Sequence, residues 1–262
     1  MLPADARGLD PWAALRASTR ARIGLGRVGD ALPLHEVLRF QLAHARARDA
    51  VHSALDVDSV SREVAPLPSI AVQSAAPDRV AYLRRPDLGR ELNPAYRDAL
   101  AAGRRGAGGW DVVFVAADGL SAIAVQRHAG PLIHACRARL PGWSVAPVIV
   151  ATQARVALGD EIGERIGARF SVVLIGERPG LSVADSLGVY LTCGPRVGRR
   201  DSERNCISNI HPCGASIEAA ADLLAWLLTE AGRLKLTGVG LKDDRAAIAV
   251  SGHPLLPPST IL

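Results

Sequence analysis

In the C-terminal half of the chain, short apolar runs alternate with stretches whose apolar positions follow a helical period. The apolar runs end at polar, glycine or proline turns, as buried strands do. Strands separated by helices predict right-handed β-α-β crossovers, and hence an α/β fold with a Rossmann-like, mostly parallel sheet flanked by helices. The predicted strands are residues 111–117, 147–151, 170–176 and 187–192, the last being a strand or a helix that leads into one. The predicted helices run from the turn after residue 118 to about 140, from 160 to 166 and from 216 to 229.

The N-terminal part of the chain has a different pattern, of helices and loops. Residues 33–51 place apolar side chains on one face and predict a strong helix. Residues 54–79 contain Pro and Ser without a clear period, which predicts a linker or an excursion over a partner. Residues 79–102 indicate helical pieces, and the glycine-rich residues 103–109 a flexible boundary. The chain therefore divides into a helical N-terminal region (1–107) as an extension, an α/β domain (108–245) and a flexible tail (246–262).

Composition narrows the class of protein. The chain has 262 residues, of which 48% are hydrophobic, enough for one large domain or a domain with an extension. No apolar run reaches the roughly 18 residues that a membrane span needs, and the start lacks a signal peptide, so we expect a soluble cytoplasmic protein. The net charge of +5 comes almost entirely from Arg. It reflects either a high-GC coding bias or an acidic partner; no motif points to nucleic acid.

Polar residues gather where the predicted strands end. Glu177 and Arg178 follow the third strand, where open α/β sheets bind ligands; the alternative is a salt bridge between the two. Asp118 follows the first strand and either caps the next helix or opens a helix N-terminus that holds an anion or an amide. Residues 205–210 bring small polar groups into a loop. Cys206 lies in this loop, as a ligand contact or as a small buried hydrophobe.

The chain shows no self-evident catalytic set. It has no G-x-S-x-G elbow, no Walker loop and no HExxH motif. Its four cysteines form no CxxC pair, and in a cytoplasmic chain we expect them to be reduced. The nearest histidine after Cys206 is His211, five residues on, which disfavours a Cys-His nucleophile. His44 and His52 share a helix face without a third ligand, so no metal site is predicted.

Several separate motifs, placed in order along residues 10–241, resemble one known family. Four lie in the α/β domain: Asp118-Gly-Leu-Ser-Ala, Leu174-Ile-Gly-Glu-Arg-Pro-Gly, Asp185-Ser-Leu and Glu203-Arg-Asn-Cys-Ile-Ser-Asn-Ile. Three more begin at Thr19, Phe40 and Tyr82 in the N-terminal region. Together these motifs resemble the small (light) subunit of ethanolamine ammonia-lyase.

The resemblance implies a function and a set of partners. Such a subunit works with a large TIM-barrel subunit in a hetero-oligomer that converts ethanolamine to acetaldehyde and ammonia by a radical mechanism with adenosylcobalamin. The large subunit binds ethanolamine and supplies most catalytic groups, so no catalytic residue is assigned here, and region 1–107 is expected to dock on that subunit. Matched residue by residue, the cobalamin contacts fall on Val156, Glu177 and Cys206. These types suit the cofactor, because a carboxylate accepts corrin amide N–H groups while Val and Cys pack against apolar atoms.

Two further expectations follow from the resemblance. Enzymes that replace the cofactor's own base with a protein His share an Asp-x-His-x-x-Gly motif, which is absent here, so we predict base-on binding. Family members often reside in bacterial microcompartments within the cytoplasm. The alternative function is a corrinoid-binding module without turnover. A nucleotide-binding dehydrogenase is disfavoured, because one Gly follows the first strand where the dinucleotide fingerprint needs three.

Overall fold

The computed structural model describes residues 10–106 and 108–243, and these residues contain one six-stranded sheet. The strand order across the sheet is β1-β3-β2-β4-β5-β6. The strands are β1 (Ser69–Gln73), β2 (Trp110–Ala117), β3 (Val148–Thr152), β4 (Ala168–Gly176), β5 (Leu187–Cys193) and β6 (Arg204–Ile210). The predicted strands of the C-terminal half are therefore confirmed, and the fourth is a strand rather than a helix. The predicted tail, residues 246–262, lies outside the described residues.

The sheet is mixed, which corrects the prediction of a Rossmann-like, mostly parallel sheet. Strands β1, β3, β2 and β4 pair in parallel, whereas β4 with β5 and β5 with β6 pair antiparallel. The physical reason lies in the connections. Parallel neighbours need a long crossover, here made by α6 (Ala122–Ala138) and α7 (Leu158–Ile166), whereas antiparallel neighbours can be joined by a loop. No α-helix lies between β4 and β6, whose residues are all described, so the chain reverses twice.

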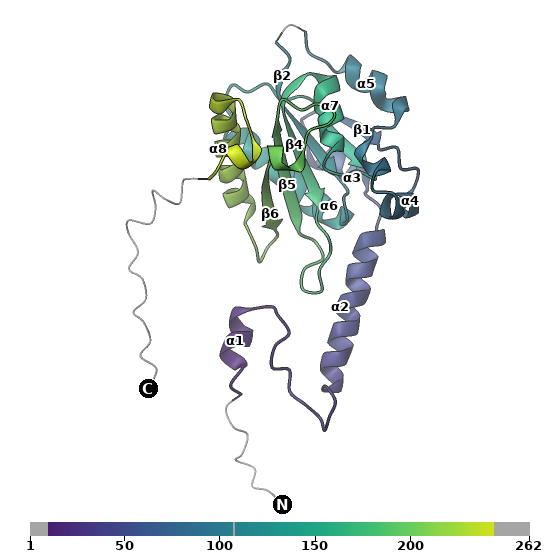
Figure 1. Cartoon of the computed structure of the whole chain (residues 1–262), viewed down its shortest axis with the longest axis vertical. Helices are drawn as coiled ribbons and strands as arrows, with labels where there is room; N and C mark the ends of the chain where they lie inside the picture. Colours follow the sequence, from purple (N-terminus) through teal and green to yellow (C-terminus); the bar gives the residue numbers. More distant parts are fainter. Residues whose placement is uncertain (1–9, 107, 244–262) are drawn as a thin grey trace, which may run out of the picture.

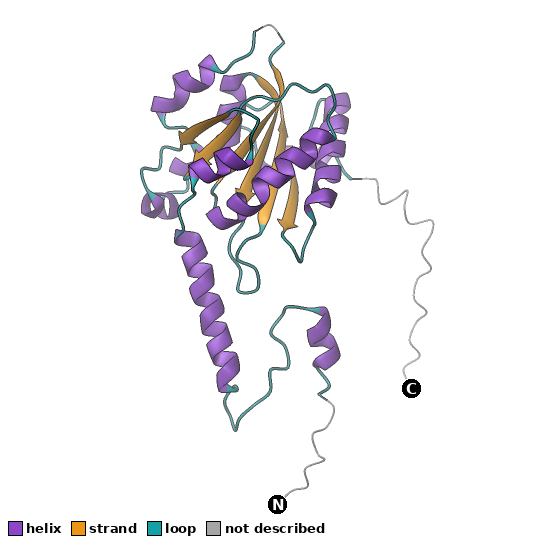
Figure 2. Ribbon diagram, turned by 180° about the vertical axis from the view of Figure 1, so that it is seen from behind, coloured by secondary structure: helices purple, strands orange, loops and turns teal. Residues whose placement is uncertain are grey.

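Helices cover both faces of the sheet, as predicted for an α/β fold (Figures 1 and 2). On one face, α6, α3 (Val57–Glu63) and α8 (Ile217–Leu234) bury apolar side chains against alternate residues of the strands. On the other face, α5 (Arg97–Ala102) and α7 do the same. The remaining helices are α1 (Ala13–Ser18), α2 (Leu34–His52), α4 (Arg79–Arg84) and the short 3-10 turns η1 (Leu88–Arg90), η2 (Pro94–Tyr96), η3 (Asp201–Glu203) and η4 (Gly238–Gly240).

The predicted linker at residues 54–79 is wrong, because this stretch contains α3 and β1. The carboxylate of Asp56 accepts the Ser59 N–H at 2.9 Å and caps α3. Strand β1 pairs in parallel with β3 at the sheet edge, so part of the N-terminal region belongs to the same sheet as the rest. A five-residue edge strand with a single buried position carries little alternation, which explains why the pattern does not reveal it.

Helix α2 confirms the helix predicted at residues 33–51 and extends away from the α/β body (Figure 1). Its only buried residues are Ala47 and Ala50, near its C-terminal end. Toward its N-terminus, Leu34, Leu38 and Leu42 form a stripe at helical spacing and are 71%, 54% and 51% exposed. Among the described residues, no helix combines the length and the apolar character needed to cross a membrane.

Candidate functional site

The three residues predicted to contact a cofactor come from three separate elements. Val156 lies in the turn between β3 and α7, and Glu177 directly follows β4. The prediction that Cys206 lies in a loop is wrong, because Cys206 lies within β6 and pairs with Tyr190 of β5. Within β6, Ile207 is buried and Cys206 is exposed, and the two side chains lie on opposite faces of the sheet. The residues that resemble a loop sequence are thus part of an edge strand.

Glu177 is held in place by two donors. The Ser186 hydroxyl donates to its Oε2 at 2.5 Å, and the Asn209 N–H, at the end of β6, donates to its Oε1 at 3.3 Å. The predicted alternative, a salt bridge to Arg178, is not among the ion pairs of the described residues. At Gly188 a Cβ atom would lie 3.0 Å from Glu177 Oε1, so glycine at this position avoids a steric clash with the carboxylate. The half-buried carboxylate retains acceptor capacity for a ligand.

Tyr190 connects the three predicted residues, and sequence reasoning missed it. A hydrogen bond joins its side chain to that of Cys206. Burial, followed by the charges of Cys206 and Glu177, raises the pKa of Tyr190 to about 12, so its hydroxyl stays protonated at neutral pH. Its ring also lines the same cavity as Val156. The sequence signal that could have identified Tyr190 is the alternation of β5, in which Val189 and Leu191 are buried and Tyr190 points outward. Placing Tyr190 beside Cys206 also requires recognising β6 as a strand.

The cavity shared by Val156 and Tyr190 has a volume of about 420 Å³. Its wall combines an apolar and aromatic part with two arginines and one acidic residue. The lining residues are Pro86, Arg90, Arg155, Val156, Ala157, Tyr190 and Asp201.

The thiol of Cys206 is not activated as a nucleophile. Loss of water around the sulfur raises its pKa, the hydrogen bond from Tyr190 lowers it, and the Glu177 charge raises it again, with a net rise above the usual value. A raised pKa keeps the sulfur as a neutral thiol at pH 7, since the thiolate is the reactive form. Cys206 is therefore suited to packing against a ligand.

Asp118 does not cap α6, which was one of the two roles predicted for it. The cap of α6 is Ser121, whose hydroxyl accepts the Ala124 N–H at 3.4 Å. Asp118 instead accepts the backbone N–H groups of Gln153 at 2.8 Å and Ala154 at 2.9 Å, and pairs with Arg79 at 3.4 Å. Burial raises the pKa of Asp118, and these backbone hydrogen bonds oppose the rise. Its carboxylate thus fixes the turn that carries Val156.

Comparison with known proteins agrees with the motifs. Residues 9–242 match the model of the family described as ethanolamine ammonia-lyase light chain (EutC). The chain belongs to the ethanolamine ammonia-lyase light chain family. The resemblance inferred from the motifs is therefore confirmed.

Individual relatives of this light chain are similar over nearly their whole length, and each is named ethanolamine ammonia-lyase small subunit. The protein of Azotobacter vinelandii is 50% identical over 260 residues, covering 97% of this chain and 96% of its own. That of Xanthomonas campestris is 53% identical over 261 residues, covering 96% and 92%. That of Pseudomonas putida is 51% identical over 243 residues, covering 90% and 88%.

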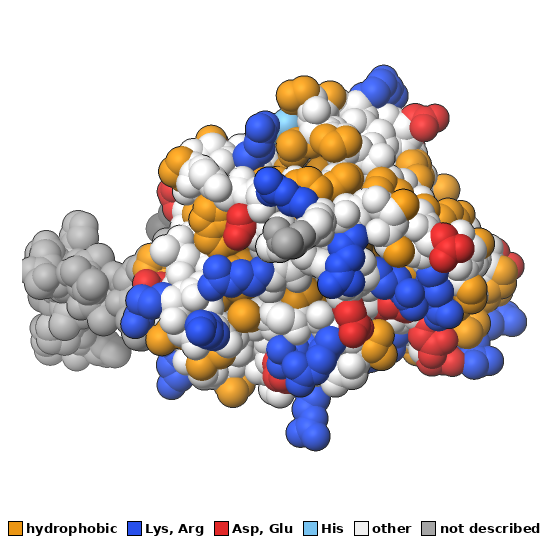
Figure 3. All heavy atoms as spheres, turned by 90° about the horizontal axis from the view of Figure 1, so that it is seen from above, with side chains coloured by type: hydrophobic (Ala, Val, Ile, Leu, Met, Phe, Trp, Pro, Cys, Tyr) orange, Lys and Arg blue, Asp and Glu red, His pale blue; other side chains and the backbone are white. Residues whose placement is uncertain are grey.

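The positive charge of this light chain does not form one basic patch on the face seen from above. Figure 3 shows Lys and Arg side chains scattered there among apolar and neutral ones. Within the described residues, no group of three or more His, Cys, Asp or Glu side chains could hold a metal ion. The three predicted cofactor contacts, Val156, Glu177 and Cys206, group around Tyr190.

Proposed function

We propose that this chain is the small subunit of an adenosylcobalamin-dependent ethanolamine ammonia-lyase. In this function it binds the cofactor at the interface with a large TIM-barrel subunit, and the hetero-oligomer converts ethanolamine to acetaldehyde and ammonia by a radical mechanism. The observation that carries the proposal is the meeting of Val156, Glu177 and Cys206 around Tyr190. Residues from three elements converge on one solvent-facing side of the sheet, next to a cavity. The names of the relatives support the same reading.

The residues of this cluster fit a corrinoid. The rim of a corrin carries amide side chains, and the Glu177 carboxylate accepts N–H hydrogen bonds. Val156 and the Tyr190 ring offer apolar surface, and the neutral Cys206 thiol packs as a small soft group. Adenosylcobalamin, when bound, supplies the radical chemistry of the reaction. This chain's residues bind and orient the cofactor and shield it from water, which is why none of them is assigned a catalytic role.

The N-terminal region, residues 1–107, is proposed to dock on the large subunit. The leucine stripe of α2, together with Trp12 at 47% and Phe40 at 46% exposure, presents apolar surface with few intramolecular contacts. Apolar surface of this kind is typical of protein interfaces. The location that goes with this function is the cytoplasm, or a bacterial microcompartment within it.

Release of ammonia and acetaldehyde from ethanolamine plus adenosylcobalamin tests the proposal. Three samples are compared: this chain alone, a cognate large subunit alone, and the two together. Activity in the mixture alone is the expected result. A complex that binds cobalamin without turnover would instead support the corrinoid-binding module, and failure to form a complex would contradict the subunit role.

A further inference from the structure

Arg155 stands out in the wall of the cavity next to Val156. Its guanidinium carbon lies 4.3 Å from the centre of the Tyr82 ring, a cation–π contact that holds the side chain. Its Nε is buried and has no hydrogen-bond partner within the described part of the chain. The acidic residue of the same cavity, Asp201, has a carboxylate that is 78% exposed and pairs with Arg204. Arg155 is thus a positioned cation without a paired anion among the residues described.

A second arginine is brought to the same cavity by the backbone. The Arg155 N–H donates to the Gly89 carbonyl at 2.8 Å, which fixes the η1 turn beside it. A Cβ on Gly89 would lie 2.9 Å from Arg155 Cγ and 3.0 Å from the Tyr82 ring, so only glycine allows this close approach. The next residue, Arg90, is exposed and lines the cavity.

The start of α7 closes this side of the cavity without offering free donors. Ala157 lines the cavity, and the N–H groups of Leu158 and Gly159 already donate to the carbonyls of Arg155 and Val156. The positive groups of the cavity are therefore the two guanidinium groups, which suit an anion.

We propose that Arg155, assisted by Arg90, binds the phosphodiester of the cofactor's nucleotide loop. This inference rests on the proposed function. The corrin side chains are neutral amides, so the phosphodiester is the anionic group that the peripheral part of cobalamin offers to a cation. Glu177 and the two arginines then have separate tasks: the carboxylate accepts amide N–H groups, and the arginines donate to phosphate oxygens. The arrangement also fits base-on binding, because the nucleotide loop that carries the phosphate also carries the base.

A series of three corrinoids isolates the phosphate. Adenosylcobalamin contains the phosphodiester and the base, adenosylcobinamide phosphate keeps a phosphate without the base, and adenosylcobinamide has neither. Equilibrium dissociation constants are measured by absorbance titration on the complex of the full chain with its cognate large subunit. The variants are Arg155→Gln, Arg90→Gln and Arg155→Lys. The matched control is Arg137→Gln, an exposed arginine of α6 on the opposite face of the sheet.

Arg155→Gln should weaken binding of adenosylcobalamin and adenosylcobinamide phosphate roughly ten- to a hundredfold, the range of a charge-assisted hydrogen bond, and leave adenosylcobinamide nearly unchanged. Arg90→Gln should give a smaller loss with the same ligand pattern, and Arg155→Lys an intermediate one. The control should bind all three like the unmodified complex.

An equal loss for all three ligands, in both glutamine variants, would show that the arginines act through the shape of the site and would overturn the inference. So would unchanged binding in both. If the unmodified complex bound no corrinoid, the proposed function itself would be contradicted. Failure of the phosphate inference can therefore be distinguished from failure of the proposed function.

Discussion

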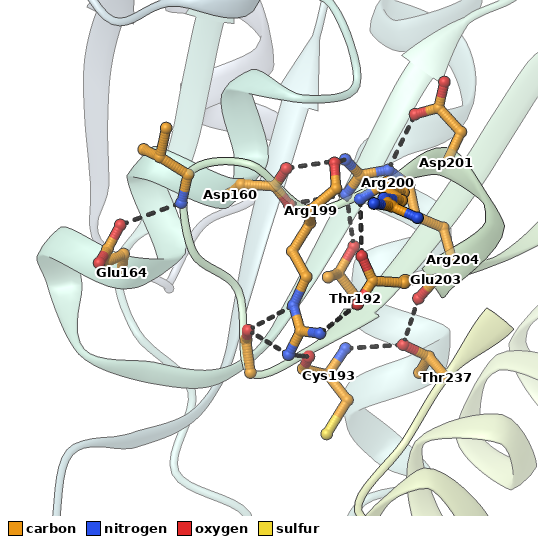
Figure 4. Close-up of polar contacts among 12 residues, drawn as sticks. Asp160, Glu164, Thr192, Cys193, Arg199, Arg200, Asp201, Glu203, Arg204 and Thr237 are labelled. Atoms are coloured by element: carbon orange, nitrogen blue, oxygen red, sulfur yellow. Dashed lines mark hydrogen bonds and ion pairs between the residues drawn. The ribbon is translucent and has the colours of Figure 1, made fainter.

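Asp160 and Arg204 form a two-point ion pair inside the protein, between α7 and the first residue of β6 (Figure 4). Arg204 Nη1 lies 2.6 Å from Asp160 Oδ1, and Nη2 lies 2.7 Å from Oδ2. The Arg204 side chain is 2% exposed and the Asp160 side chain 3%. Arg204 also donates to the Thr192 hydroxyl at 2.9 Å and the Arg199 carbonyl at 3.2 Å. The pair therefore fastens the edge strand that carries Cys206 to the helix that follows Val156.

Asp160→Asn should lower the free energy of unfolding by about 3–5 kcal/mol, because it leaves the Arg204 charge buried without its counter-ion. Urea unfolding of the isolated chain measures the change. The control is Glu230→Gln, which removes the exposed pair with Arg233 and should cost less than about 1 kcal/mol. Replacing both partners by apolar residues, as in Asp160→Leu with Arg204→Met, should recover much of the loss. Equal effects of Asp160→Asn and the control would contradict this account.

Glu177→Ala should weaken adenosylcobalamin binding to the complex roughly tenfold, the cost of one hydrogen bond to a charged group. The measurement is the dissociation constant from absorbance titration. Cys206→Ala should have a smaller effect, since it removes packing atoms only. Glu230→Gln again serves as the control, because it lies on α8 against the other face of the sheet. An unchanged dissociation constant for the Glu177→Ala variant would show that Glu177 does not contribute to cofactor binding.

The strands β2, β3 and β4 could be predicted because buried parallel strands are continuous apolar runs. Strand β6 could not, since Asn205, Cys206, Ser208 and Asn209 are polar or small, as in a loop. Its buried apolar residues Ile207 and Ile210 are three positions apart, because the pairing with β5 shifts register between Leu187 and Val189, so no regular alternation is visible. The family motifs predict Val156, Glu177 and Cys206 as cofactor contacts. The roles proposed for Tyr190 and Arg155 depend on tertiary proximity, which the sequence does not show.

Alkylation of Cys206 should be slow at pH 7 and rise only above the usual thiol range, because its pKa is raised. Reaction with iodoacetamide, followed residue by residue by mass spectrometry across pH, gives the apparent pKa. Two variants should move it in opposite directions. Glu177→Gln removes a negative charge and should lower the pKa of Cys206, whereas Tyr190→Phe removes a hydrogen bond and should raise it. Shifts of the same sign in both variants would be inconsistent with this cluster.

The base-on prediction can be tested by electron paramagnetic resonance of the cobalt(II) form in the complex. If cobalt keeps the cofactor's own base, a ¹⁵N-labelled dimethylbenzimidazole should change the nitrogen splitting. A ¹⁵N-histidine-labelled protein should leave the splitting unchanged. Splitting that follows the protein label would show a histidine ligand and overturn the prediction.

Removing the start of the chain should separate folding from assembly. A cut after residue 50 would remove the buried Ala47 and Ala50 and disturb Val51, whose carbonyl accepts from Arg79 at 2.7 Å. Deletion of residues 1–45 keeps these contacts, so we expect a folded α/β domain. Its far-ultraviolet circular dichroism should differ from that of the full chain only by the loss of α1 and most of α2.

The same deletion should abolish co-purification with the large subunit, because it removes most of the exposed apolar surface of α1 and α2. The matched variant in the full-length chain is Leu38→Glu with Leu42→Glu, which places charge on the leucine stripe without shortening the chain. Its control is Gln41→Glu, an exposed polar position of the same helix. Deletion also removes Arg22, which donates to the Leu181 carbonyl at 3.1 Å in the loop after Glu177. A loss of assembly in the deletion but not in the double-leucine variant would therefore assign the effect to other residues of the deleted segment, whereas a loss in the double-leucine variant assigns it to α2.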